Sequence, residues 1–202
     1  MSVVSSPDDV FINCPFDADY APIFQAIIFA VFACGFRPRS AKEIDDAGNT
    51  RYEKITRIIG ECRYGIHDIS RTECDPVFNL PRFNMPFELG FFLAAKQFGG
   101  DDHAKKRALV LDVEPYRYQR FISDLNGMDI TTHDGDPTKA ARAVRNWLAN
   151  VSRRRLTPDR EVADLLIKFN AALPKLAKAA GFDGHSVPYV DFEYLVTDWL
   201  LA

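Results

Sequence analysis

Short apolar segments alternate with longer segments of helical periodicity from Asp9 to Val151. The short segments predict strands at Asp9–Cys14, Phe36–Ala41, Arg63–Ile69, Lys106–Asp112 and Met128–Thr132. The longer segments predict helices at Tyr20–Cys34, Thr50–Gly60, Asn84–Phe98, Tyr116–Leu125 and Pro137–Val151. Regular strand–helix alternation is typical of a doubly wound parallel sheet with right-handed connections.

The expected fold class is therefore α/β, with a five-stranded parallel sheet in the order 2-1-3-4-5 and helices on both faces. Strands one, three and four have the most buried character, which favours the centre of the sheet. Pro38 cannot donate a ladder hydrogen bond, so the second strand is expected at an edge. Residues 8–152 are expected to form this domain.

The pattern changes after Pro158, where only helical spacing remains. Val162, Leu165 and Phe169 mark one amphipathic helix, and Val190 to Leu201 mark another. Residues 158–202 are therefore expected to form a helical C-terminal extension that packs on the flank of the sheet. A lid, or a subunit interface in a homo-oligomer, is the alternative role for this extension.

Composition narrows the class of protein. The chain has 202 residues, a net charge of −3 and 47% hydrophobic residues, which is typical of a globular protein without a basic nucleic-acid surface. The cysteines form no CxxC pair and accompany no histidine cluster, so no metal site is expected. The apolar run from Ile23 to Cys34 is shorter than the ~20 residues that span a bilayer, and no signal peptide is evident. The expected location is the cytoplasm, with no membrane or nucleic-acid partner.

Several nucleotide-binding and hydrolase motifs are missing from the sequence. The turn after the first predicted strand reads Asn13-Cys14-Pro15-Phe16-Asp17 and not GxGxxG, so a dinucleotide site of the usual kind is not expected. The chain also lacks the GxxxxGKS or GxxxxGKT loop of NTPases and the GxSxG elbow of α/β hydrolases. The remaining candidate chemistry is acidic and aromatic.

Two carboxylates occupy positions where open α/β sheets bind ligands. Asp68 lies near the end of the third predicted strand, and Glu88 lies in the first turn of the next helix, with Asn84 as the expected N-cap. The ends of parallel strands and the starts of the following helices meet at one edge of the sheet. The positive end of the helix dipole is expected to keep Glu88 ionised. A carboxylate there can stabilise or attack the oxocarbenium-like centre that forms when a glycosidic bond breaks.

Further polar and aromatic residues follow the first three predicted strands. They are Asn13, Phe16 and Asp17 after strand one, Glu43, Asp45, Asp46 and Arg51 after strand two, and Arg71 and Asn84 around the long loop Ser70–Phe83. The expected substrate-binding residues among them are Asn13, Phe16, Asp17, Arg51, Arg71 and Asn84. Aromatic rings can stack a base, carboxylates can hold a ribose, and arginines suit phosphate oxygens. Ordinary surface ion pairs are the alternative for the arginines.

The segment Phe11-Ile12-Asn13-Cys14-Pro15-Phe16 resembles the first-strand motif of nucleoside 2-deoxyribosyltransferases. Asp68 and Glu88-Leu89-Gly90 resemble the strand-end aspartate and helix glutamate of the same family, and TIR-type NAD hydrolases share this plan. The resemblance implies a flavodoxin-like fold over about residues 8–150, with Glu88 as the catalytic residue and Asp68 as a substrate contact. It also implies, from similar bacterial proteins, a link to antiphage defence. The chain departs from the transferases at Met85-Pro86-Phe87, where that family has a small pair before its glutamate.

The expected function is cleavage of an N-glycosidic bond in NAD, a nucleoside or a nucleotide, by hydrolysis or by base transfer. No cofactor is expected, because NAD or a nucleotide would be the substrate. Glu88 favours this enzyme. The altered residues before Glu88 favour a second hypothesis, a non-catalytic module that senses a nucleotide or assembles with a partner. A scaffold that oligomerises through its C-terminal helices is a third hypothesis.

Overall fold

The computed structural model describes residues 6–43, 46–75, 77–182 and 187–202. The described residues form a five-stranded sheet in the order β2-β1-β3-β4-β5, and every pairing in it is parallel. The strands are β1 (Ser6–Asn13), β2 (Arg37–Arg39), β3 (Cys62–Asp68), β4 (Arg107–Asp112) and β5 (Ile130–Thr132). The fold is therefore flavodoxin-like α/β, and the predicted strand order is confirmed. Pro38 lies in an edge strand, as its missing N–H requires.

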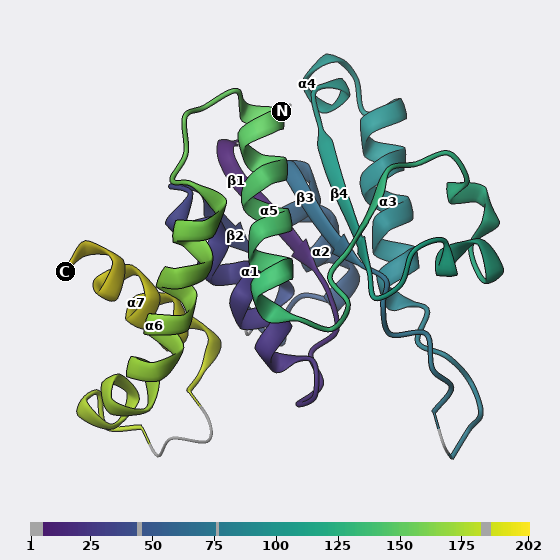
Figure 1. Ribbon diagram of the computed structural model, residues 1–202. Coiled ribbons are helices and arrows are strands. Elements are labelled where there is room, and N and C mark those ends of the chain that lie inside the picture. The colour runs from purple at the N-terminus through teal and green to yellow at the C-terminus, as the bar shows by residue number, and fades with distance from the viewer. Residues whose placement is uncertain (1–5, 44–45, 76, 183–186) are drawn as a thin grey trace.

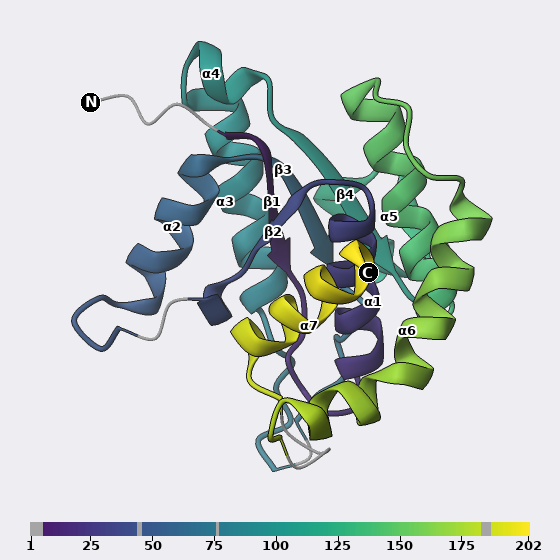
Figure 2. The same cartoon turned by 90° about the vertical axis from the view of Figure 1, so that its left-hand side faces the viewer.

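Helices cover both faces of the sheet (Figures 1 and 2). One face carries α1 (Ala21–Ala33) and α5 (Pro137–Ser152), and the other carries α2 (Arg51–Glu61) and α3 (Asn84–Phe98). Alternate residues of β1 face opposite sides, so Val10 and Ile12 pack in the cluster of α1 and α5 while Phe11 packs with α2 and α3. A short helix, α4 (Asp101–Ala104), precedes β4.

The C-terminal region adds α6 (Asp159–Ala179) and α7 (Tyr189–Leu201), which lie outside α1 and α5 (Figure 2). These helices share one hydrophobic cluster with the sheet and α1. Phe169 of α6 stacks on Phe29 of α1 with ring centroids 5.2 Å apart, and Trp199 of α7 lies 6.0 Å from Phe29. The extension is thus helical, and its apolar side chains complete the core on that flank.

The segment Tyr116–Leu125, predicted as one α-helix, forms two short 3-10 helices, η2 (Arg117–Arg120) and η3 (Ser123–Leu125). Tyr116 adopts a left-handed conformation with φ of 57°, and Ile122 between the two turns has φ of −146°. Arg117 holds the segment in place, because its guanidinium donates to Asp112 and to the carbonyls of Ile69 and Ser70. The prediction of a continuous helix was wrong because these tertiary bonds fix an irregular backbone.

The start of α3 also differs from the prediction. Asn84 is the first residue of the helix and not its N-cap; the cap position belongs to Phe83, which forms no side-chain cap bond within the described chain. Phe83 has near-helical angles, φ −91° and ψ −3°, and its carbonyl accepts from Phe87 N at 3.0 Å. The helix therefore begins a residue earlier than a cap at Asn84 allows. Glu88 consequently lies in the second turn of α3 and not in the first.

Among the described helices, none is long and apolar enough to cross a lipid bilayer.

Candidate functional site

Glu88 faces a small pocket between α2 and α3, at the end of the sheet where the strands terminate. The pocket encloses about 140 Å³ and is lined by Arg51, Tyr52, Ile55, Asn84, Phe87, Glu88 and Phe91. Only 8% of the Glu88 side chain is exposed, although α3 runs along the surface of the molecule. The pocket brings together three of the predicted site residues, Arg51, Asn84 and Glu88.

Burial raises the pKa of Glu88 from 4.5 to about 7, and nearby Arg51 opposes this shift. Arg51 Nη2 lies 3.8 Å from Glu88 Oε1, and more than half of the Arg51 side chain is exposed. The prediction that helix N–H groups keep Glu88 ionised was wrong. Because Glu88 lies in the second turn, loss of water outweighs any benefit from the helix start. Near neutral pH the carboxyl group populates both its protonated and its ionised form.

Aromatic rings form the wall of this pocket. Phe87 packs edge-to-face on Phe91 with centroids 4.6 Å apart, and Tyr52 of α2 packs on Phe91 at 5.3 Å. Tyr52 and Phe87 are more than half exposed. The sequence alone did not single out these rings, although Phe87 and Phe91 are spaced so that they lie on one side of a helix. A half-open aromatic wall beside a carboxyl group suits a flat heterocycle.

Phe16 was predicted to bind substrate, but it is not among the described residues that line this pocket and lies beside it. Its ring packs on Phe24 at 5.4 Å, with Lys42 Nζ 4.7 Å above it. The Arg51 guanidinium lies 5.8 Å from the same ring. Arg51 is therefore the residue that links Phe16 to Glu88.

Asp68, the last residue of β3, is fully buried among polar groups of Tyr20, Ser70 and His133. Asp68 Oδ2 accepts from Tyr20 Oη at 2.6 Å, and Asp68 Oδ1 accepts from Ser70 N at 2.8 Å. His133, just beyond β5, places Nε2 3.0 Å from Asp68 Oδ2, and its Nδ1 accepts from Gly135 N at 3.0 Å. Asp68 thus lies at the strand end, as predicted, yet its oxygens contact protein groups outside the pocket of Glu88.

Asp17 and Arg71 line a second pocket. This pocket of about 290 Å³ lies near the start of the β3–α3 loop and is lined by Asp17, Asp19, Arg71, Glu73, Cys74, Asp75 and Arg82. Arg71 Nη2 donates to Asp17 Oδ1 at 3.0 Å, and Arg82 lies 3.9 Å from the other oxygen of Asp17. Arg71 is therefore already paired with a carboxylate.

The acidic candidates after β2 have local structural roles. Glu43 accepts from Arg39 at 2.8 Å, and Asp46 accepts from Gly48 N at 2.8 Å. Asp45 lies outside the described residues. Asn13, the last residue of β1, is buried and bonds to His67 and to the carbonyl of Met85. The predicted site residues thus divide between the Glu88 pocket, the Asp17 pocket and buried networks.

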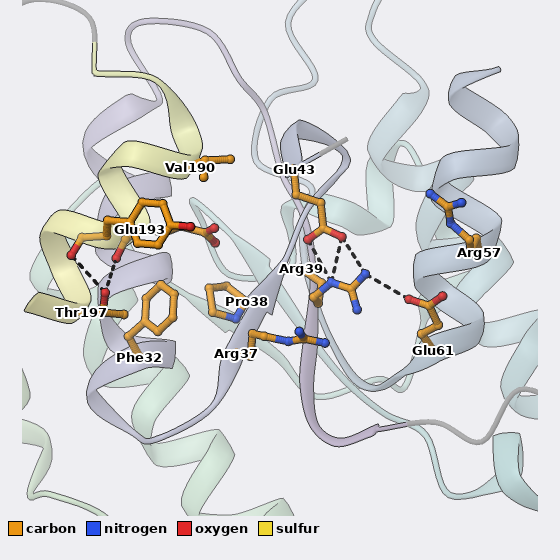
Figure 3. Close-up of a pocket in the computed structure, with 11 residues that line it drawn as sticks. Phe32, Arg37, Pro38, Arg39, Glu43, Arg57, Glu61, Val190, Glu193 and Thr197 are labelled. Atoms are coloured by element: carbon orange, nitrogen blue, oxygen red, sulfur yellow. Dashed lines mark hydrogen bonds and ion pairs between the residues drawn. The ribbon is translucent and has the colours of Figure 1, made fainter. Parts of the chain in front are cut away.

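A larger cavity of about 720 Å³ follows the open edge of β2 (Figure 3). It is lined by Phe32, Arg37, Pro38, Arg39, Glu43, Arg57, Glu61, Val190, Glu193, Tyr194 and Thr197. Most of its charges neutralise each other. Arg37 donates twice to Asp9, and Arg39 pairs with Asp9, Glu43 and Glu61. These ion pairs stabilise the edge strand β2 and engage most of the charged groups in the cavity. The cavity therefore offers few unpaired groups for chemistry in spite of its size.

Across the described ranges of the chain, no group of His, Cys, Asp and Glu side chains is arranged to hold a metal ion. No family model matches the chain, and no curated protein matches its sequence. The flavodoxin-like fold and the buried carboxyl group of Glu88 in its aromatic pocket are the features of this protein that bear on its function.

Proposed function

We propose that this protein binds a nucleoside, a nucleotide or NAD in the pocket between α2 and α3 and cleaves its N-glycosidic bond. The observation that supports this proposal is a nearly buried carboxyl group, Glu88, beside an aromatic wall at the strand-end edge of the sheet. The pocket of about 140 Å³ is smaller than a whole-nucleotide site and suits a single heterocyclic base. The sugar and any phosphate would extend toward the exposed Arg51.

The chemistry follows from the charge that develops during cleavage. As the bond between C1′ and the base nitrogen breaks, its electron pair leaves with the base and positive charge builds on the sugar ring. Ionised Glu88 stabilises that charge, or forms a bond to C1′ that water or a second base later replaces. Arg51 favours the ionised form of Glu88 that this step requires.

A non-catalytic nucleotide sensor is the second candidate. The position of Asp68 favours it, because among the residues that the structure describes Glu88 is the only acidic one that lines the aromatic pocket. A glycosidase site of the two-carboxylate type uses a second carboxyl group beside the scissile bond. A sensor would bind the same base and leave its glycosidic bond intact.

The setting we propose is bacterial antiphage defence in the cytoplasm, where NAD and nucleotides are available. The resemblance of the segment from Phe11 to Phe16, and of Glu88-Leu89-Gly90, to enzymes that act on these molecules supports this setting. Homo-oligomerisation through α6 and α7 belongs to the same proposal, and exposed Ile167, Tyr194 and Leu201 on these helices support it.

The test is release of free base from NAD and from a panel of nucleosides and nucleotides, measured by chromatography. Glu88→Gln keeps the shape of the side chain and removes its charge, so it should slow release by about a hundredfold or more. Glu161→Gln, an exposed change on α6, is the matched control and should leave the rate unchanged. Equal rates for wild type and Glu88→Gln would exclude Glu88 as the catalytic group. Binding without release would establish the sensor.

A further inference from the structure

A buried polar link connects the end of β1 to the beginning of α3. We propose that Asn13 and His67 form a positioning unit that holds the first turn of α3 against the sheet and thereby keeps the Glu88 carboxyl group inside its pocket. Neither side chain lines that pocket. The functional meaning of the unit rests on the proposed role of Glu88, but its structural effect is measurable without any substrate.

The amide of Asn13 makes both contacts of the link. Asn13 and His67 are paired across β1 and β3, and they are 2% and 0% exposed. Asn13 Nδ2 donates to the carbonyl oxygen of Met85 at 2.8 Å and lies 3.0 Å from His67 Nδ1. An amide nitrogen carries two hydrogens, so one group can serve both acceptors. The reversed amide would place its oxygen against the Met85 carbonyl, so the acceptors fix its orientation.

The imidazole of His67 is a neutral acceptor in this link. Because Nδ1 accepts from Asn13, its proton resides on Nε2. Burial lowers the pKa of His67 to about 3, so the ring stays neutral at working pH. Nε2 has no hydrogen-bond partner among the described residues, and the ring packs edge-on against Phe92 with centroids 4.9 Å apart. The packing against Phe92 limits rotation of the buried imidazole.

The link anchors the first turn of α3 to the sheet, and the described residues supply no side-chain cap that would fix this turn locally. Phe83, at the cap position, contributes no side-chain cap bond in the described structure. The Asn13 bond instead ties the Met85 carbonyl to β1, while the Met85 side chain packs with Ile69 and Val110. Glu88 follows Met85 by three residues and lies on the neighbouring helix surface. A shift of the first turn would therefore carry the Glu88 carboxyl group toward solvent.

The experiment is an NMR titration of the full chain with ¹³C-labelled glutamate carboxyl groups, with Glu88→Gln used to assign the Glu88 signal. The wild-type midpoint of Glu88 is expected near 7. Asn13→Leu removes the donor and His67→Leu removes the acceptor, so both should move the midpoint toward the ordinary value of 4.5. His67→Gln keeps an acceptor for Asn13 and should restore a midpoint close to that of the wild type.

Two comparisons separate positioning from a general loss of stability. Phe169→Leu, a core change on the opposite face of the sheet, should lower stability and leave the Glu88 midpoint unchanged. An unchanged midpoint in folded Asn13→Leu and His67→Leu would overturn the proposal, and so would equal midpoints for His67→Gln and His67→Leu. If Asn13→Leu does not fold, the pair of His67 variants decides by the same measurement. This titration uses no substrate, so a negative result would not contradict the proposed N-glycosidic cleavage. Likewise, absence of base release would not contradict the positioning role of Asn13 and His67.

Discussion

At the scale of single residues, two opposing effects determine the pKa of Glu88: burial raises it, and the nearby Arg51 lowers it. The carboxyl group is almost fully buried, and one exposed arginine lies 3.8 Å away. A partly solvated arginine at that distance compensates only part of the cost of burying a charge. Glu88 therefore retains its proton up to near-neutral pH, while a typical surface glutamate is ionised.

Burial of Glu88 should make stability depend on pH. Its folded-state pKa of about 7 exceeds the ordinary 4.5, so its favourable contribution is present below pH 4.5 and is lost as pH rises through 7. Glu88→Gln should thus be more stable than wild type at pH 8, by about 1–3 kcal/mol, and similar to wild type at pH 4.5. Urea unfolding at the two pH values measures the difference. A constant difference between the two proteins would contradict the assignment.

Base release, if Glu88 acts when ionised, should increase with pH around a midpoint near 7. Arg51→Gln removes the group that lowers the pKa of Glu88, so the midpoint should move to higher pH. Arg57→Gln is the matched control, because Arg57 lies on the same helix and lines the cavity along β2. The pH–rate profile of the control should overlay that of wild type, and the same displacement in both variants would argue against a specific Arg51–Glu88 interaction.

At the scale of elements, α2 and α3 begin in different ways. Thr50 caps α2, since its hydroxyl accepts from Glu53 N at 3.2 Å and the Glu53 carboxylate accepts from Thr50 N at 2.8 Å. This reciprocal pair makes the start of α2 a local property of the sequence. The start of α3 lacks such a cap among the described residues, and the Asn13 amide of β1 anchors it by donating to the Met85 carbonyl. Local bonds therefore fix α2, one wall of the Glu88 pocket, and a tertiary bond from β1 fixes α3, the other wall.

Thr50→Ala should destabilise the protein by about 1 kcal/mol, because the start of α2 loses its capping hydroxyl. Thr56→Ala makes the same substitution inside α2, where the hydroxyl donates to backbone carbonyls of its own helix. That control should change stability by less than about 0.5 kcal/mol. Chemical denaturation of both variants gives the comparison, and equal losses would show that the capping box contributes nothing specific.

At the scale of the whole molecule, the C-terminal helices belong to the same core as the sheet. Phe169 is fully buried among the rings of Phe29, Phe192 and Trp199, which come from α1 and α7. Removing residues 158–202 would therefore uncover α1 and α5, so a truncation cannot separate folding from assembly. Surface substitutions on α7 are the cleaner way to test an oligomer.

Phe169→Ala should lower the free energy of unfolding by about 3–5 kcal/mol, because it opens a cavity between α6, α1 and α7. Tyr194→Ala on the exposed side of α7 should change it by less than about 0.5 kcal/mol. Urea denaturation measures both values, and light scattering on Tyr194→Ala reports whether α7 supports a homo-oligomer. A small effect at Phe169 would mean that the extension folds independently of the sheet.

The sequence by itself determined the layout of this protein. Alternating periodicity placed the strands and all but one of the predicted helices, and Pro38 marked the edge strand. These features depend on local spacing and on backbone chemistry, which a sequence displays directly. The sequence also predicted Glu88 as a site residue beside Arg51 and Asn84, and these three side chains line one pocket.

Only the tertiary structure decided the environment of each candidate. In the folded protein Asp68 contacts Tyr20 and His133. Asp17 and Arg71 line a different pocket from that of Glu88. The helix expected at Tyr116–Leu125 is replaced by two short 3-10 helices. The tertiary structure also raised the pKa of Glu88 to about 7, so that a carboxyl group expected to be ionised is partly protonated near neutral pH. Burial and hydrogen-bond partners come from residues far apart in the chain, so local spacing does not predict them. The pKa of a side chain depends on its exposure to water and on nearby charges, and both are set by the folded structure.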